Sequence, residues 1–547
     1  MLIEAAGPVG RAVDILVLLA AVAAVFTASA LAGAGFLWGL PSASHVQSYH
    51  PDEQNVTYSL RNMDPAHFDF NPQFFGNPIF FTYQVGALAL AASAVGILPR
   101  ETGEEYWLTH PGAVRSFYIL GRALSFVYAL LAAFALYALT RRVSDSPRAA
   151  LLAVLIFVSL PVTAVHSHYM TVNASAVFYS LMALLFALKI QETPLWRHYV
   201  LAGVFAGLAI STKLNNALLP FAIFAAHMTA PCKGARWKSI FSRKIVTAAF
   251  VTAAAFFVGS PYYVLDYASV AANPHNQMNM TALADFSTAL SVVFRDFANH
   301  MTAACGWAFA ALLIIALPAA PFVLRKRSVP LVAVALPFLL IGVKSGWWAF
   351  PSRLWPLLAV LTVCLATMTA VKTAWLRYGV AVLVAAGLVS TVVWNAAYLG
   401  LTSGRHVREE SSDWILRTIP QGETIIVLDT PYFDDPNLVY EVAVHGRYLS
   451  PQSAEPVHYD IENLKGRFDL LPDARGSWFV VPQRFEPEIE KRGSINIPKY
   501  AAGNGFTEVT VFKRDFTAFG VTLRDWVPAD MVQDYPVYIF LRIEPRT

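Results

Sequence analysis

The sequence predicts a polytopic α-helical membrane protein that carries an α/β domain at its C-terminal end. Three observations predict this fold class. Hydrophobic residues make up 56% of the 547 residues, charged residues make up only 14%, and the mean hydropathy is +0.49, whereas soluble domains are about one quarter charged. Apolar segments long enough to span a bilayer recur along the first 400 residues. After Leu401 the composition becomes charged and is punctuated by Pro and Gly.

About eleven apolar segments have spanning or near-spanning length. They lie at residues 13–39, 116–140, 149–165, 174–190, 199–212, 215–230, 245–264, 303–324, 329–343, 354–371 and 378–400. The first is longer than the apolar region of a signal peptide, so we interpret it as a retained helix.

Clusters of Lys and Arg orient these segments, because positively charged loops stay on the cytoplasmic side. With a cytoplasmic N-terminus, the clusters at 141–148, 233–244, 325–327 and 372–377 all fall on that side. A further apolar stretch at 78–98 would break this agreement if it crossed, so we interpret it as a re-entrant or juxtamembrane helix. We therefore expect a multi-pass protein of the inner or plasma membrane.

This orientation predicts two domains. Residues 1–404 form the transmembrane domain, whose first extracytoplasmic loop covers 40–115, and residues 405–547 form an extracytoplasmic α/β domain. Within the tail, the hydrophobic pattern predicts an amphipathic helix and four strands. The helix is expected at 407–419, and the strands at 424–428, 478–481, 507–512 and 537–543.

Two adjacent carboxylates, Asp52 and Glu53, follow the first apolar segment in the sequence Tyr49-His50-Pro51-Asp52-Glu53-Gln54. An unpaired carboxylate close to the bilayer is costly unless a site uses it. The like charge of the neighbour, together with partial burial, would raise the pKa of one carboxyl towards neutrality, as a general base requires. The alternative is that the pair solvates a loop, as most carboxylates do.

The second outer connection contains His166, His168 and Asn173. Two histidines spaced by one residue can bind a divalent cation together with Asp52 or Glu53. They can equally donate hydrogen bonds to a phosphate or lie among the lipid headgroups. A metal ion therefore stays an open possibility. Motifs for nucleotide phosphates, dinucleotides or a zinc protease are absent from the sequence, so no other cofactor is indicated.

Few cations lie on the outer side. Lys213 interrupts an apolar helical hairpin, Arg353 follows the aromatic turn at 346–350, and Arg122 lies early in the second spanning segment. Each is either an anchor at the membrane interface or part of a group that neutralises an anion there. The net charge of +4 is small, and no long basic face occurs, so nucleic acid is not an expected partner.

Five segments, taken in order, resemble the GT-C membrane glycosyltransferases, and within them the protein O-mannosyltransferases and the lipid A aminoarabinose transferase. They are the Asp52-Glu53 pair, Asn77-Pro78-Ile79-Phe80-Phe81-Thr82-Tyr83, Gly121-Arg122-Ala123-Leu124-Ser125 in the helix that ends at Arg141-Arg142, Gly207-Leu208-Ala209-Ile210-Ser211-Thr212-Lys213, and Arg353-Leu354-Trp355-Pro356. The resemblance covers roughly residues 10–400 and implies a GT-C-like fold.

The resemblance also implies an inverting transferase that takes a sugar from a polyprenyl-phosphate donor to a lipid, glycan or protein acceptor. Asp52 would be the general base, with Glu53 as its electrostatic neighbour. Members of the family often carry a second acidic residue near the second outer loop, where this chain has Asn173. We expect Arg353, Lys213, His168 and Arg122 to bind the donor phosphate, and His50, Tyr83, His166 and Asn173 to bind substrate.

Two other classes of protein compete with this interpretation. A polytopic transporter or lipid flippase would use Asp52, Glu53 and the histidines as an ion relay. Against it, the carboxylates lie in a loop and the sequence lacks the paired half-repeats of many transporters. A structural assembly protein would use the outer domain for contacts. Each class has membrane lipids as partners.

Overall fold

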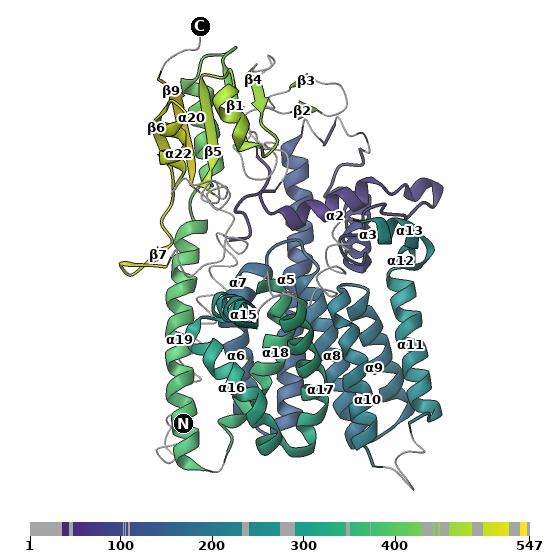
Figure 1. The fold of residues 1–547 in the computed structure, drawn as a ribbon. Coiled ribbons are helices and arrows are strands. Elements are labelled where there is room, and N and C mark those ends of the chain that lie inside the picture. The colour runs from purple at the N-terminus through teal and green to yellow at the C-terminus, as the bar shows by residue number, and fades with distance from the viewer. Residues whose placement is uncertain are drawn as a thin grey trace. The chain divides into compact units, whose positions relative to one another are not determined.

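The computed structural model describes residues 35–42, 48–101, 103, 106–107, 110–231, 240–273, 290–345, 351–371, 373–428, 441–442, 447–448, 459–483, 496–523 and 536–543 (Figure 1). The predicted first helix at 13–39 lies outside these residues except for its last five positions. The aromatic turn at 346–350 also lies outside them.

The chain forms two compact units. The first, which we call the helical unit, contains the described residues of 55–88 and 121–397. The second, which we call the C-terminal unit, contains those of 34–54, 89–120 and 398–547. Two stretches from the predicted first outer loop and the helix after it therefore pack with the tail of the chain.

Helices dominate the described chain up to residue 418. They are α2 (Pro51–Arg61), η2 (Pro65–His67), α3 (Phe80–Ala94), α5 (Pro111–Ser144), α6 (Pro147–Ser159), α7 (Pro161–His166), α8 (Asn173–Glu192), α9 (Trp196–Ile210), η3 (Leu214–Leu218), α10 (Leu219–Thr229), α11 (Arg243–Gly259), α12 (Tyr262–Leu265), α13 (Tyr267–Ala272), α15 (Leu290–Cys305), α16 (Trp307–Leu324), η5 (Arg325–Ser328), α17 (Val329–Ser345), α18 (Pro351–Met368), α19 (Ala374–Thr402) and α20 (Val407–Thr418).

Four helical stretches among the described residues are long and apolar enough to cross a membrane. They are Pro111–Ser144, Asn173–Glu192, Trp307–Ile341 and Arg377–Thr418, and the shorter apolar helices are Phe80–Ala94, Pro147–Ser159, Trp196–Ile210 and Ser352–Met368. The third stretch contains two helices, because η5 places three basic residues in its middle. These helices support an integral membrane protein, but they do not confirm the predicted count of eleven.

The apolar stretch at 78–98 folds as α3, a helix of 15 residues. A helix of this length extends about 22 Å, which is less than the roughly 30 Å hydrocarbon core of a bilayer. The chain then turns at Gly96, which has a φ of +80°. The length of α3 is thus compatible with the expectation that this stretch does not cross the membrane.

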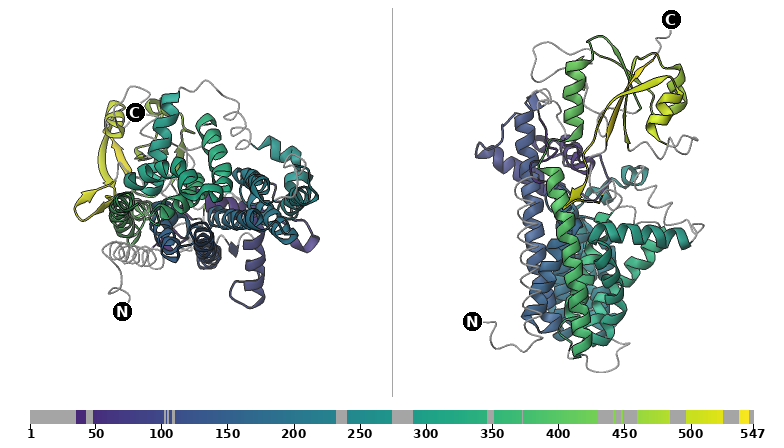
Figure 2. Two further views of the ribbon diagram at one scale, coloured as in Figure 1. Left: turned by 90° about the horizontal axis from the view of Figure 1, so that it is seen from below. Right: turned by 90° about the vertical axis from the view of Figure 1, so that its left-hand side faces the viewer.

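The helical unit contains a group of adjacent helices, α8 to α11, which run side by side in both figures (Figures 1 and 2). Helix α9 packs against α8 on one side and α11 on the other. Gly203 and Gly207 lie one turn apart on α9 and face α11. A Cβ atom at Gly207 would lie 2.4 Å from the carbonyl oxygen of Thr252, so the close approach of these backbones requires glycine, as in other small-residue helix interfaces in membranes.

The loop before α3 packs on the short helices after α11. The hydroxyl of Tyr263 donates a hydrogen bond of 3.0 Å to the carbonyl of Phe75, and the two rings meet edge to face. The side-chain amide of Asn71 donates to Asp266 at 2.9 Å, and this hydrogen bond lowers the pKa of the Asp266 carboxyl. In contrast, Phe68 lies at a turn with 83% of its surface exposed.

The C-terminal unit contains a five-stranded sheet in the order β4-β1-β5-β9-β6. Strands β4, β1 and β5 are parallel, and β9 and β6 are antiparallel to their neighbours. The pairing of β6 with β9 shifts register between Glu508 and Thr510. The strands of this sheet are β1 (Thr424–Val427), β4 (Asp460–Asn463), β5 (Trp478–Pro482), β6 (Phe506–Phe512) and β9 (Val537–Arg542).

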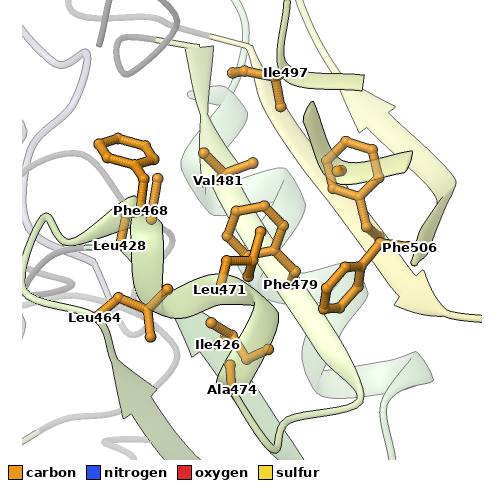
Figure 3. Close-up of a cluster of buried hydrophobic side chains, with 12 residues drawn as sticks. Ile426, Leu428, Leu464, Phe468, Leu471, Ala474, Phe479, Val481, Ile497 and Phe506 are labelled. Atoms are coloured by element: carbon orange, nitrogen blue, oxygen red, sulfur yellow. The ribbon is translucent and has the colours of Figure 1, made fainter. Parts of the chain in front are cut away.

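Side chains alternate between the two faces of this sheet, as the period of a strand requires. Ile426 of β1 and Phe479 of β5 point to a core formed with η7 (Phe468–Asp473) and α22 (Ile497–Gly503), as Figure 3 shows. Ile425 points to the opposite core, which α20 covers. The sheet is thus buried on both faces by helices.

The predicted tail helix and all four predicted strands are present, within two residues of their expected ends. The sequence analysis missed β4, α22 and the two-residue strands β2 (Glu441–Val442), β3 (Arg447–Tyr448), β7 (Thr517–Ala518) and β8 (Val521–Thr522). Strand β4 has the sequence Asp-Ile-Glu-Asn, which lacks the run of β-branched and aromatic residues that marks a strand. Its position beside β1 comes from tertiary pairing.

We expect Gly207→Ala to lower the free energy of unfolding by about 1–3 kcal/mol, because the added methyl group forces the α9 and α11 backbones apart. Thermal unfolding of the purified protein in detergent measures this. Gly379→Ala on α19 is the matched control, since a Cβ there meets no atom within 4 Å. Equal melting temperatures for the two variants would contradict the packing argument.

Candidate functional site

The Asp52-Glu53 pair lies in the first turn of α2, in the part of that helix that belongs to the C-terminal unit. Pro51 occupies the first helical position, where its missing N–H costs nothing. The ring nitrogen Nδ1 of His50 accepts a hydrogen bond of 3.2 Å from the backbone N–H of Asp52. This contact satisfies one of the unpaired N–H groups at the helix start and fixes the peptide that carries Asp52.

The two carboxylates occupy different environments. Glu53 is fully buried and accepts a hydrogen bond from the hydroxyl of Ser48, whereas Asp52 is exposed. The side-chain amide of Gln54 donates to the carbonyl of Ser48 at 3.0 Å and closes the turn. We expected the base to be partly buried, and this expectation is wrong for Asp52, which is exposed. The buried carboxylate is that of Glu53, because it points back into the turn.

His50 is buried, with 4% of its surface exposed. Its backbone N–H donates to the hydroxyl of Ser48 at 3.1 Å, and its ring supports the backbone of Asp52. In this structure His50 therefore organises the turn around Asp52, and its predicted role in substrate binding stays a prediction.

The helical unit brings together two segments that the sequence analysis selected, Gly121–Ser125 of α5 and the loop His166–Asn173. The guanidinium of Arg122 is fully buried and lies 5.1 Å from the centre of the Tyr169 ring. A Cβ atom at Gly121 would lie 2.1 Å from the sulfur of Met170. Glycine at this position thus lets the loop approach α5 and brings Arg122 beside Tyr169.

Lys213 is tied to the same loop. Its Nζ donates a hydrogen bond of 2.7 Å to Oδ1 of Asn173, the first residue of α8. Asn216 secures the turn that carries Lys213, because its amide donates to the carbonyl of Ala209 at 2.9 Å and its Oδ1 accepts from Ser180 at 2.9 Å. The turn between α9 and α10 is thereby fixed to α8, and the ammonium group lies at the N-terminal end of that helix.

Ser211 and Ser260, the residues that follow α9 and α11, hold the start of α3 in the same unit. The carbonyl of Ser211 accepts hydrogen bonds from the backbone N–H of Phe80 at 3.1 Å and from the hydroxyl of Ser260 at 3.0 Å. The hydroxyl of Ser260 in turn accepts from the N–H of Ile79 at 3.0 Å. The segment that contains Tyr83 is thus joined to the turn that carries Lys213. Tyr83 itself donates to the carbonyl of Phe70 at 3.0 Å.

The histidines of the loop are buried, and each has a structural contact. The Nδ1 of His168 donates to the carbonyl of Ala164 at 2.9 Å, which fixes the ring against α7. The ring of His166 lies 6.5 Å from that of Trp355 on α18. Arg353 lies two residues before Trp355 in the first turn of α18 and is half-buried.

The predicted donor-phosphate residues Arg122, His168, Lys213 and Arg353 all belong to the helical unit, whereas Asp52, Glu53 and His50 belong to the C-terminal unit. Within the described part of the chain, no three His, Cys, Asp or Glu side chains are grouped so that they could hold a metal ion. The helical unit therefore contains cations and hydrogen-bond donors that suit an anion. The C-terminal unit contains an exposed carboxylate, that of Asp52.

Sequence reasoning missed Ser48, Gln54, His406 and Arg408. The first two complete the turn around Asp52. His406 caps α20 and Arg408 lies in its first turn, and both side chains contact Tyr49. A buried Arg at the start of a predicted amphipathic helix was the signal available, but its partner lies 359 positions away in the chain.

Comparison with known proteins defines the class. Residues 119–264 match the family described as dolichyl-phosphate-mannose-protein mannosyltransferase. This range includes Arg122, the loop 166–173 and Lys213. The match confirms the predicted resemblance to the GT-C membrane glycosyltransferases, in particular to the protein mannosyltransferases. Among curated proteins, no sequence matches this chain.

Several solved structures are similar to the chain, and three of them illustrate the similarity. ArnT from Cupriavidus metallidurans, bound to undecaprenyl phosphate, is 13% identical, with 96% of this chain and 98% of that chain covered and a TM-score of 0.49. An oligosaccharyltransferase of Archaeoglobus fulgidus tethered to an acceptor peptide is 12% identical, with 86% and 69% covered and a TM-score of 0.46. The Pmt1-Pmt2 protein O-mannosyltransferase complex of S. cerevisiae is 18% identical, with 48% and 35% covered and a TM-score of 0.31.

We expect Lys213→Met to weaken the binding of polyprenyl phosphate by about 1.5–3 kcal/mol, the range for one hydrogen bond to a charged group, which is about tenfold or more in Kd. Titration of the purified protein with polyprenyl phosphate measures this. Lys213→Arg should retain most of the affinity. Lys189→Met, at the other end of α8 where Lys189 lies over the ring of Phe186, is the matched control. An unchanged Kd for Lys213→Met would exclude this lysine from the phosphate site.

Proposed function

We propose that this protein is an integral membrane glycosyltransferase that moves a sugar from a polyprenyl-phosphate donor to a lipid, glycan or protein acceptor, with inversion at the sugar. The observation that carries the proposal is the exposed Asp52 on a turn whose other polar groups are buried and hydrogen-bonded to one another. A base must reach the acceptor, and it must be held in one orientation. The match to a family that is named for a dolichyl-phosphate sugar donor supports the class of donor.

In the proposed reaction, Asp52 removes the proton from an acceptor hydroxyl or amide. The acceptor atom then attacks the anomeric carbon of the donor sugar while the bond from that carbon to the phosphate oxygen breaks. The bonding electrons leave with the polyprenyl phosphate, and the proton stays on the carboxyl of Asp52. A single displacement of this kind inverts the configuration at the anomeric carbon.

Negative charge develops on the departing phosphate, and fixed cations stabilise it. Lys213, held by Asn173, and Arg353 at the start of α18 are the proposed contacts. Arg122 beside Tyr169 is buried, so we assign it the shaping of the loop 166–173 as well as long-range attraction for the anion. Glu53, hydrogen-bonded to Ser48, keeps the turn closed.

The proposal places this reaction on the outer face of the membrane, with the N-terminus inside and residues 405–547 outside. The distribution of Lys and Arg supports this orientation. Sugar nucleotides are made in the cytoplasm, and the predicted inner loops are short and basic. A lipid-linked sugar, by contrast, delivers both donor and leaving group at the level of the membrane.

We expect Asp52→Asn to reduce transfer by about 10²–10⁴-fold, the usual contribution of a general base. Because Asp52 is exposed, the variant should melt within a few degrees of the wild type. Glu53→Gln should retain more activity but lose about 1 kcal/mol of stability, since the amide oxygen can still accept from Ser48 while the buried charge is lost. Rates with a labelled donor and melting temperatures test both statements. Full activity of Asp52→Asn would remove the base from the mechanism.

We expect the purified protein to consume a polyprenyl-phosphate sugar and release polyprenyl phosphate, with no dependence on nucleotides. Arg353→Ala should lower the rate by about 10²-fold, the scale for losing one charge contact in the transition state. Chromatography of the lipid products provides the measurement. Transfer from a nucleotide sugar without lipid would contradict the proposed donor, and ion-coupled uptake into proteoliposomes without transfer would favour a transporter.

A further inference from the structure

The C-terminal unit contains a buried contact between the start of α20 and the segment that precedes Asp52. The guanidinium carbon of Arg408 lies 4.1 Å from the centre of the Tyr49 ring, and Nη2 of Arg408 donates to the carbonyl of Tyr49 at 3.4 Å. The ring of His406 lies 4.1 Å from that of Tyr49 and 4.8 Å from that of Trp38. Arg408, His406 and Tyr49 each have no more than 2% of their surface exposed.

A buried guanidinium is costly unless its surroundings replace water. The contacts of Arg408 include the aromatic face and the backbone carbonyl of Tyr49, and its Nη2 lies 3.4 Å from Nε2 of His406. Its own backbone N–H donates to Nδ1 of His406 at 3.2 Å, so His406 caps α20. The quadrupole of an aromatic ring attracts a cation over its face, and the attraction is stronger in a desolvated site, so this contact constrains the position of Tyr49.

Tyr49 is joined to Asp52 through a short chain of bonds. Its backbone N–H donates to the carbonyl of Gly39 at 3.1 Å. The residues on either side of it, Ser48 and His50, are the two that hold the turn: Ser48 bonds to Glu53, and the ring of His50 accepts from the N–H of Asp52. A shift of Tyr49 would therefore move both supports of the Asp52 peptide at once.

We propose that Arg408 is a positioning residue for Asp52, so that the C-terminal tail helps to set the orientation of the catalytic base through α20. This inference rests on the proposed function, because it takes Asp52 as the base. Arg408 acts through Tyr49 and has no contact with substrate in the proposal. The tail then contributes to the rate of the chemical step in addition to its own fold.

Arg408→Met tests the proposal, because methionine fills much of the same volume without the charge or the donors. We expect kcat to fall by about 10²-fold, the scale for misplacing a reacting group by about 1 Å, while KM for the polyprenyl-phosphate sugar changes by less than about twofold. Arg408→Lys keeps a cation over the ring and should recover part of the loss. Tyr49→Leu, which removes the ring from the other side of the contact, should reproduce the effect.

Arg514→Met is the matched control. Arg514 pairs with Glu410 of the same helix α20 at 2.6 Å and donates to the carbonyl of Leu401 at 3.4 Å, so its loss perturbs the tail away from Tyr49. Hydrogen exchange of the peptide 48–54 in the full-length protein gives a readout independent of activity. Exchange there should accelerate in Arg408→Met and Tyr49→Leu but not in Arg514→Met.

The outcomes separate this inference from the proposed function. If the wild type shows no transfer, the proposed function fails, while the exchange data still report whether Arg408 orders the turn. If Asp52→Asn is inactive but folded Arg408→Met and Tyr49→Leu have the kcat of the wild type, the positioning role is wrong and the enzyme assignment stands. Equal losses of kcat in Arg408→Met and Arg514→Met would also overturn it, because they would indicate a general effect on the tail.

Discussion

The hydroxyl of Ser260 makes the connection on which much of the helical unit depends. It donates to the carbonyl that ends α9 and accepts from the N–H that begins the α3 segment, so three distant stretches of chain meet at one side chain. Helix ends inside a membrane protein leave backbone groups that lipid cannot satisfy. Serine at the end of α11 satisfies two of them. The turn that carries Lys213 comes directly after Ser211 in the chain, so this junction helps to fix its position.

Because lipid cannot satisfy polar groups, polar side chains inside the helical unit hydrogen-bond to one another. Asn173, Lys213, Asn216 and Ser180 join α8 to the turn after α9 through hydrogen bonds of 2.7–2.9 Å. Each of these side chains hydrogen-bonds to another, so the turn that carries Lys213 is fixed to α8.

The sequence was sufficient to predict a mostly helical membrane protein and to select candidate site residues, but not to predict how those residues are arranged. Periodicity predicted α20 and four strands, because their apolar patterns are local, whereas β4 is a strand only through its pairing with β1. Lys213 and Asn173 were both selected, yet their mutual hydrogen bond depends on how α8 and α9 pack. The difference in burial between the exposed Asp52 and the buried Glu53 arises from the phase of α2, which His50 and Ser48 set through contacts that no local pattern encodes. The contact between Arg408 and Tyr49 joins residues that lie 359 positions apart in the chain.

The sheet of the C-terminal unit ends in two strands that resist pairing with another chain. The outer strand β4 carries the exposed Asp460, and the carboxylate of Glu462 on the same strand accepts hydrogen bonds from the backbone N–H groups of Arg475 and Gly476. Strand β6, at the opposite edge, carries Glu508 beside the register shift against β9. Charges and irregular registers at sheet edges discourage strand addition. A protein confined to a membrane surface meets copies of itself at high local concentration, where an open edge would promote fibrous aggregation. Asp460 and Glu508 place a negative charge at each edge of this sheet, which opposes such aggregation.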